Sequence, residues 1–341
     1  MTIQRLLTIE DLSAEDVRSI LLVAEALEVH AQVHGYLPPL LRGKCMGMIF
    51  DETSLRTRTA FERAMGDLGG QAIHYNGKEA RIGIHAAKQE HLEDFVNVAG
   101  RFNDVLLSRI YDFKVQQRIA DLSPVPFING MCDLHHPTQA LCDFLTLTRR
   151  FGDVTGLKIA FVGDGTNIAL SLAQTAAKLG ANFVCATPSG WGLPEAAVTD
   201  LAGYCATVDP IAAVADAHVV VTDSWIPMNR SHEAEARRSL LAPYRVTAAL
   251  MSHARADAIF LHNLPAYRGD EVLPEVIDGP QSVIYDEAVA RLHIARALLL
   301  AMLRPDWNEL VISIQSAQQQ PDELSSCLAN FVKVAVRVKA A

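Results

Sequence analysis

The sequence has no long apolar run and no closely paired cysteines. Its longest apolar stretches, such as "AHVVVT" and "ARALLLAML", are shorter than the roughly 18 residues that a membrane-spanning helix needs. The absence of any C-x-x-C pair argues against a structural zinc site and against a disulfide framework. We therefore predict reduced and mostly packed cysteines at Cys45, Cys132, Cys142, Cys185, Cys205 and Cys327.

The chain also lacks an excess of positive charge. Its 39 acidic residues outnumber the 30 lysines and arginines, for a net charge of −9, so no broad basic surface is expected for nucleic acid or an anionic membrane. An anionic ligand would have to be bound by a local cluster. The N-terminal segment "MTIQRLLTIEDLSAED" has no basic segment followed by an apolar one, which predicts a cytoplasmic location.

With 341 residues, half of them apolar, the chain is long enough for two domains. The segment "LSAEDVRSILLVAEALEV" predicts a first helix with a capping box of Ser13 and Asp16. Short apolar runs then alternate with amphipathic stretches, which is typical of α/β domains with parallel sheets. The predicted strands are residues 43–50, 71–75, 104–109, 125–128, 157–162, 181–186, 217–222, 258–262 and 282–285.

The stretch "FDETSLRTRTAFERAM" concentrates arginines and hydroxyls where a strand ends and a helix begins. Free backbone N–H groups and the helix dipole attract anions at such a position. A bound dianion would also explain Arg56 and Arg58, which would otherwise repel the positive end of the dipole. The alternative is a solvated helix start whose arginines pair with Asp51 and Glu52.

A second helix entrance, in "CDLHHPTQALCDF", carries His136, Pro137 and Gln139. Proline suits the first helical position, and His136 and Gln139 project to the same side of a first turn. They are suited to bind one small ligand, although capping alone would also explain them.

Three further strand ends carry polar residues. "FVGDGTN" suggests a dinucleotide site, but Ile168 stands where the third glycine belongs and the next strand lacks the acidic residue for a ribose. "TDSWIPMNR" contains Asp223, and "LHNLP" contains His262. Taken singly, these residues have an ordinary structural explanation.

In order along the chain, "SLRTR", "SRIYDF", "HHPTQ", "GDGTN", "TDSWIPM", "HNLP" and "ARLH" resemble the transcarbamylases, and among them the ornithine carbamoyltransferases. The likeness covers about residues 5–303. It implies two doubly wound parallel-sheet α/β domains with the active site in the cleft between them, and no metal or organic cofactor. It also implies a carbamoyl phosphate-binding domain at 1–148, an acceptor-binding domain at 149–299, and helices of about 300–341 that pack back on the first.

The resemblance assigns the donor site residue by residue. It implies a phosphate cradle formed by Ser54, Leu55, Arg56, Thr57 and Arg58, and contacts to the carbamoyl group from Arg109, His136, Gln139, Arg291 and the Leu264 carbonyl. The residues expected to act in catalysis are Arg56, Thr57, Arg109, His136 and Arg291.

For the acceptor, the resemblance implies that Asn167 and Asp223 bind an amino-acid head, with further contacts from Pro227, Met228, Asn263 and Leu264. The sequence departs from the family pattern here. Pro227 and Asn229 replace a serine and a glycine, and Asn263 replaces a cysteine. Asparagine cannot take up a proton at neutral pH, so these changes favour an altered acceptor.

Other departures concern possible subunit contacts. Arg81 stands where the family has a glutamine that reaches a neighbouring site, about three extra residues lie near 84–89, and Lys88 is a second basic candidate there. The tail beyond Met302 exceeds the usual family end, and "ELSSCLANFVKVAVRV" predicts a helix used in subunit contact. The resemblance implies a homotrimer with shared active sites.

These observations predict a carbamoyltransferase that acts on ornithine or a related diamino compound. A carbamoyltransferase of specialised metabolism with another acceptor is one alternative. A non-catalytic protein that binds carbamoyl phosphate is a second, and an NAD-dependent dehydrogenase, weakened by the missing acidic residue, is a third. Small molecules are the expected ligands, with no nucleic acid and no membrane.

Overall fold

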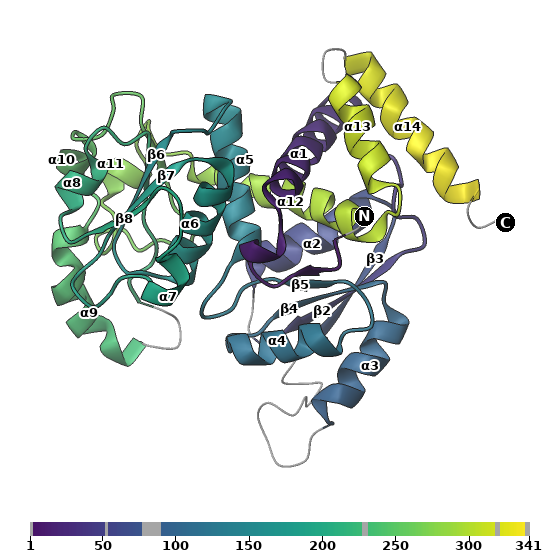
Figure 1. Ribbon diagram of the computed structural model, residues 1–341, viewed down its shortest axis with the longest axis horizontal. Coiled ribbons are helices and arrows are strands. Elements are labelled where there is room, and N and C mark those ends of the chain that lie inside the picture. Colours follow the sequence, from purple (N-terminus) through teal and green to yellow (C-terminus); the bar gives the residue numbers. More distant parts are fainter. Residues whose placement is uncertain (1–2, 52–53, 77–89, 227–230, 318–320, 338–341) are drawn as a thin grey trace. The chain divides into compact units, whose positions relative to one another are not determined.

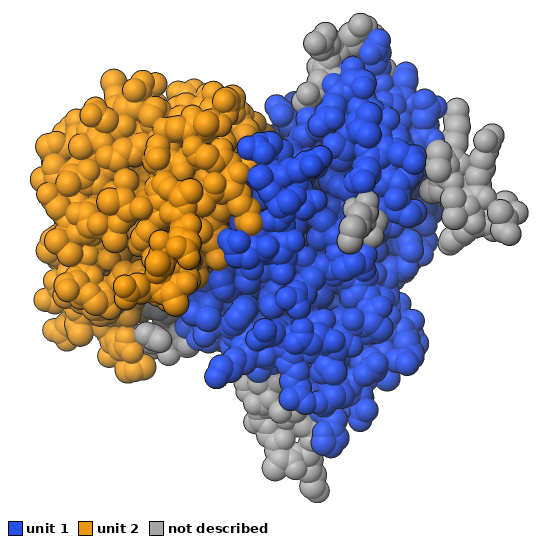
Figure 2. Space-filling view, in the orientation of Figure 1, with its two compact units in different colours: residues 1–141, 291–341 blue, residues 142–290 orange. Residues whose placement is uncertain are grey.

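The computed structural model describes residues 3–51, 54–76, 90–226, 231–317 and 321–337. They form two compact units, residues 1–141 with 291–341, and residues 142–290 (Figure 2). The chain passes between the units within helices α5 (Pro137–Phe151) and α12 (Ile284–Leu303). Within the described ranges, no helix has the length and apolar content needed to cross a membrane.

The first unit is built on a five-stranded parallel sheet in the order β1-β5-β4-β2-β3 (Figure 1). Its strands are β1 (Arg5–Leu6), β2 (Cys45–Phe50), β3 (Gln71–Asn76), β4 (Val105–Arg109) and β5 (Phe127–Asn129). Besides parts of α5 and α12, its helices are η1 (Ile9–Asp11), α1 (Ala14–His34), α2 (Leu55–Asp67), α3 (Leu92–Phe102), α4 (Phe113–Leu122), α13 (Trp307–Ala317) and α14 (Pro321–Arg337).

Helices cover both faces of this sheet, α3 and α4 on one face and α2 on the other (Figure 1). Phe95, Val96 and Ile119 pack on Leu106 and Phe127 in one apolar cluster. Burial on both faces explains why β2 and β4 are nearly continuous apolar runs and do not alternate.

The second unit holds another five-stranded parallel sheet, in the order β10-β9-β6-β7-β8. Its strands are β6 (Lys158–Val162), β7 (Asn182–Ala186), β8 (Tyr204–Thr207), β9 (Val219–Val221) and β10 (Ile259–Leu261). Its helices are α6 (Asn167–Leu179), α7 (Glu195–Val198), α8 (Pro210–Val214), η2 (Ser231–Glu233), α9 (Ala234–Leu241), η3 (Ala242–Tyr244), α10 (Ala248–Met251) and α11 (Pro274–Ile277). The predicted α/β class with two parallel-sheet domains is confirmed.

Local sequence signals place several elements correctly. Helix α1 begins at Ala14 with the predicted capping box of Ser13 and Asp16, and α5 begins at Pro137. None of the six cysteines, all of which lie in the described ranges, forms a disulfide, and Cys132, Cys142 and Cys185 are buried.

One predicted strand is wrong. Residues 282–285 do not form a strand, because Ile284 starts α12 and only Ser282 makes an isolated bridge, to Phe260. The apolar pair Val283 and Ile284 fits either structure, and the long apolar helix that follows decides the outcome. The fifth strand of the sheet is β8 instead.

Candidate active site

The first candidate half-site lies at the start of α2, just beyond the end of β2. Ser54 is the N-cap residue in extended conformation, its side chain makes no capping hydrogen bond, and the helix begins at Leu55. A cap that leaves the first N–H groups without a side-chain partner keeps those donors for a ligand. The predicted helix entrance is therefore present.

Thr57 lies at the centre of this half-site and is fully buried. Its hydroxyl oxygen accepts hydrogen bonds from Arg109 Nη1 at 3.0 Å and from Arg291 Nη1 at 3.2 Å. A hydroxyl has two acceptor positions and one hydrogen. Because both acceptor positions are used by guanidinium groups, the Thr57 hydroxyl is left to donate its hydrogen to a third group.

The arginines come from distant parts of the chain. Arg56 lies in the first turn of α2, Arg109 ends β4, and Arg291 lies on α12 with only 4% of its surface exposed. Arg291 Nε is buried and has no hydrogen-bond partner among the described residues. A buried guanidinium N–H without a partner is costly unless a ligand supplies an acceptor.

His136 completes this cluster. It is 2% exposed, and burial together with Arg291, Arg109 and Arg56 holds the pKa of its imidazole well below the ordinary value. The ring is therefore neutral at pH 7, with one N–H donor and one acceptor nitrogen. A neutral ring among three guanidiniums can donate a hydrogen bond without adding a fourth positive charge.

The remaining donor-site candidates divide into buried and exposed residues. Gln139, 1% exposed, lies in the first turn of α5 beside His136. Arg58 lies on the exposed side of α2, where its Nε donates to Glu62 at 2.8 Å. The Leu55 side chain is 77% exposed. The structure thus gathers Arg56, Thr57, Arg109, His136 and Arg291, while the Arg58 guanidinium lies with Glu62.

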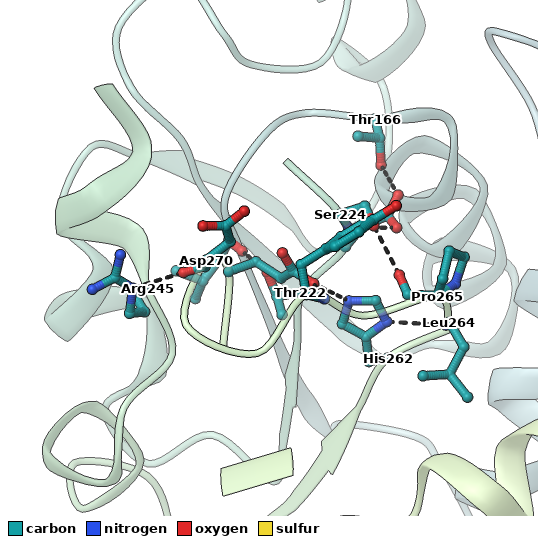
Figure 3. Close-up of polar contacts among 12 residues, drawn as sticks. Thr166, Thr222, Ser224, Arg245, His262, Leu264, Pro265 and Asp270 are labelled. Carbon is teal, nitrogen blue, oxygen red and sulfur yellow. Dashed lines mark hydrogen bonds and ion pairs between the residues drawn. The ribbon is translucent and has the colours of Figure 1, made fainter. Parts of the chain in front are cut away.

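The second candidate half-site, in residues 142–290, lies at the carboxyl ends of β6 and β9. Asp223 follows β9, and its carboxylate accepts from the Ser224 N–H at 2.8 Å and from the Thr166 hydroxyl at 3.2 Å (Figure 3). Thr166 is the N-cap of α6, and Asn167 is its first residue. Thr166 was not predicted as a site residue, although a threonine before a helix is a typical capping signal.

Burial raises the pKa of the Asp223 carboxyl above its ordinary value, and nearby His262 and the two hydrogen bonds partly offset this effect. A carboxylate that is partly desolvated gains more from binding an ammonium group than an exposed one does. Asp223 is therefore suited to bind a cationic group of a ligand.

The segment after β10 is held by a buried histidine and two buried glutamates. His262 Nδ1 accepts from the Leu264 N–H at 3.0 Å, and His262 Nε2 lies 3.1 Å from Glu271 Oε1 (Figure 3). Because a backbone N–H can only donate, Nδ1 is the unprotonated nitrogen and Nε2 carries the hydrogen toward Glu271. The His262 N–H donates to Glu287 at 2.9 Å.

This arrangement fixes the residues that follow. Leu264 has φ +55°, in the left-handed region that a branched residue rarely adopts, and the bond to His262 helps to hold it there. Asn263 Oδ1 is buried and has no hydrogen-bond partner among the described residues. The Ser224 hydroxyl donates to the Pro265 carbonyl at 2.8 Å, which joins the Asp223 segment to the "HNLP" segment.

Some predicted residues lie outside the described ranges. They are Pro227, Met228 and Asn229 in the acceptor segment, and Arg81, Lys88 and the insertion at 84–89. Sequence reasoning also missed Glu271 and Glu287, because acidic residues carry no local sign that they will be buried beside a histidine. Among the residues that the structure describes, no group of three or more His, Cys, Asp or Glu side chains could hold a metal ion.

Two family models match the chain. Residues 4–149 match the carbamoyl-P binding domain of aspartate/ornithine carbamoyltransferase, and residues 155–302 match its Asp/Orn binding domain. The chain belongs to the aspartate/ornithine carbamoyltransferase family.

Individual relatives agree with this assignment. The chain is 40% identical over 307 residues to an ornithine carbamoyltransferase of Pyrococcus abyssi, which covers 87% of this chain and 95% of the relative. It is 39% identical over 306 residues to that of Bacillus subtilis, covering 87% and 93%. A solved structure of ornithine carbamoyltransferase from Pyrococcus furiosus superimposes with a TM-score of 0.84 at 38% identity, covering 89% of this chain and 98% of the other.

Proposed function

We propose that this protein transfers the carbamoyl group of carbamoyl phosphate to the side-chain amine of ornithine, giving citrulline and phosphate. The observation that carries the proposal is the convergence of Arg56, Arg109 and Arg291 around the Thr57 hydroxyl and a neutral His136. Such a cluster suits a small dianion with a polarisable carbonyl group. The names of the relatives supply the acceptor.

The proposed reaction places negative charge where the clustered side chains can stabilise it. The amine nitrogen forms a bond to the carbamoyl carbon, while the bond from that carbon to the bridging oxygen breaks and phosphate leaves with the electron pair. The proton that the amine nitrogen loses passes to the departing phosphate. Negative charge develops on the carbonyl oxygen, where Arg109, Arg291 and the Thr57 hydroxyl donate hydrogen bonds. The neutral His136 adds a fourth donor.

The leaving phosphate is stabilised separately. In this proposal it lies on the backbone N–H groups at the start of α2, beside the Ser54 hydroxyl and the Arg56 guanidinium. Gln139 and the Leu264 carbonyl accept hydrogen bonds from the carbamoyl NH₂, which distinguishes this donor from an acyl phosphate that lacks the amide. The chain supplies alignment and fixed charge.

The acceptor is held by its amino-acid head. The Asp223 carboxylate binds the α-ammonium group, and Asn167 with the N-terminus of α6 binds the α-carboxylate. Pro227, Met228, Asn263 and Leu264 remain the proposed contacts to the rest of the acceptor. The Asn263 Oδ1 atom, which lacks a partner among the described residues, is suited to accept a hydrogen bond from the reacting amine.

The test is the product formed from carbamoyl phosphate with ornithine and with a panel of other amines. We expect citrulline with ornithine and little product with amines that lack the α-amino-acid head. Strong turnover of another diamine with none of ornithine would contradict the assignment of the acceptor. Tight binding of carbamoyl phosphate with no product from any amine would favour the non-catalytic alternative.

We also propose a cytoplasmic homotrimer. Supporting evidence comes from Val98 and Phe102, which lie four residues apart on α3 with 47% and 71% of their surface exposed. Ile73 on the edge strand β3 is also 40% exposed. Exposed apolar side chains on one helix face are typical of an interface between subunits.

The variant Phe102→Glu should therefore shift the protein toward monomers, because a carboxylate cannot be buried in an apolar interface without a partner. Light scattering after size exclusion measures the mass. The control is Val33→Glu, an exposed apolar residue on α1 that is 62% exposed. A trimer mass that stays unchanged in Phe102→Glu would show that this face does not form the interface.

A further inference from the structure

We propose that Arg237 is a positioning residue that fixes the shape of the acceptor half-site by joining three of its loops. Arg237 lies on α9 (Ala234–Leu241) and is 3% exposed. The consequence for ornithine binding rests on the function proposed above. The joining of the loops is observed independently of it.

The Arg237 guanidinium makes polar and aromatic contacts in several directions. It donates to the Trp225 carbonyl and to the Asp164 carboxylate, and its Nη1 donates to Glu233 Oε2 at 3.3 Å. Its central carbon also lies 4.6 Å from the centre of the Trp191 ring. A planar cation with five N–H donors can make these contacts simultaneously.

These contacts reach the loops after three neighbouring strands. Asp164 follows β6, Trp191 lies in the loop after β7, and Trp225 follows β9, and these strands are adjacent in the sheet as β9-β6-β7. The carboxyl ends of adjacent parallel strands are where ligands bind in such sheets. One side chain from α9 therefore connects the loops that surround the candidate acceptor site.

The loops after β6 and β7 also contact each other directly. The Gly165 N–H donates to the Trp191 carbonyl at 3.0 Å, and a Cβ atom at Gly165 would lie 2.6 Å from that carbonyl oxygen. Only glycine fits at this approach. This contact does not include the loop after β9. Arg237 connects that loop to the other two, because it contacts Trp225 as well as Asp164 and Trp191.

The acceptor residues are the immediate neighbours of the residues that Arg237 holds. Asn167 comes three residues after Asp164, and Asp223 comes two residues before Trp225, and the Thr166 hydroxyl already links these two segments. A shift of either segment would change the spacing between the amide of Asn167 and the carboxylate of Asp223. Ornithine needs that spacing for its carboxylate and ammonium groups, whereas the donor cluster around Thr57 does not include these loops.

Arg237→Lys tests the role of the guanidinium. Lysine keeps the charge beside Asp164 but has a single nitrogen, so it cannot also serve the Trp225 carbonyl and stack on Trp191. We expect the KM for ornithine to rise about tenfold, a change typical of losing one or two good hydrogen bonds. The KM for carbamoyl phosphate should stay within about twofold, because its proposed binding residues other than Leu264 lie in the other unit.

The matched control is Arg238→Lys. Arg238 is the next residue on the same helix, half exposed, and its Nε donates to both Asp270 oxygens at 2.9 Å, so the same change there should leave both KM values unaltered. Arg237→Ala with added guanidinium chloride at low concentration gives a second test. Partial recovery of the ornithine KM is expected, because the free ion can occupy the vacated position between Asp164 and the Trp225 carbonyl.

Hydrogen exchange supplies a readout that needs no substrate. In Arg237→Lys, the amides of residues 163–167 and 223–226 should exchange faster, with no change in the strands beneath them. An unchanged ornithine KM together with unchanged exchange would overturn the proposal, as would an equal rise of both KM values. If the unmodified protein made no citrulline, the proposed function would fail, and the exchange data would still decide whether Arg237 holds the loops.

Discussion

Replacing Arg291 by methionine is expected to lower kcat for carbamoyl transfer by about 10²–10³, the usual loss when one oxyanion donor is removed. Arg291 donates to the Thr57 hydroxyl and is buried with its Nε unpartnered among the described residues, so we expect a ligand oxygen to accept from this N–H group. Steady-state assays at saturating substrates measure the change. The fold should survive, because methionine packs well and one of three neighbouring positive charges is removed.

A spectroscopic readout separates this loss from misfolding. Since Arg291 is one of the charges that lower the pKa of His136, Arg291→Met should move that pKa back toward the ordinary value, which an NMR titration of the imidazole would detect. Arg118→Met is the control, since Arg118 on α4 pairs with Glu93 and its side chain is 63% exposed. A kcat within about threefold of the unmodified enzyme would remove Arg291 from the catalytic group.

The second large effect is expected from Asp223→Asn. The amide keeps the size of the side chain but loses the charge that we propose binds the α-ammonium group. The kcat/KM for ornithine should therefore fall about 10- to 100-fold, the range for a hydrogen bond to a charged group. The KM for carbamoyl phosphate should change little. If Asp223→Asn bound ornithine as tightly as the unmodified protein does, the proposed role of Asp223 in binding the α-ammonium group would be wrong.

The same substitution should stabilise the fold at neutral pH. Burial raises the pKa of Asp223, so the native state disfavours the ionised form and pays a cost above that pKa. As the pH falls below the ordinary pKa of an aspartate side chain, Asp223 becomes protonated in both the native and the unfolded state, and the cost disappears. The thermal midpoint of Asp223→Asn should therefore exceed that of the unmodified protein at pH 7, and the difference should shrink on acidification.

Asp257→Asn provides the opposite sign. Asp257 is an exposed residue whose pKa is held below its ordinary value by the hydrogen bond from Arg255, so its ionised form favours the native state. Removing the Asp257 charge should therefore leave the thermal midpoint of unfolding unchanged or slightly lower. If both variants moved the midpoint in the same direction, the cause would not be the titration of Asp223.

Much of the fold follows from short-range signals. The helix starts at Ser13, Pro137 and Ser54 all follow from residues within one turn of the chain. Ser13 acts through a capping box, Pro137 through its fixed φ angle, and Ser54 through its extended N-cap conformation. Apolar runs of five or six residues mark β2, β4 and β6, because both faces of these strands are covered. The edge strand β8 was not predicted from the sequence, because its partly exposed residues "YCAT" do not form a continuous apolar run.

By itself, the sequence determined the α/β class, the helix start that presents Ser54 to Arg58, and a set of polar residues at strand ends whose order resembles one family. Only the tertiary structure decided which of those residues meet. Arg291 donates a hydrogen bond to Thr57, which is 234 residues away along the chain. Arg58 donates to Glu62, and Arg237 joins three loops. The physical reason is that a helix start is fixed by residues within one turn of the chain. These contacts depend instead on how distant elements pack, and no local pattern records that packing.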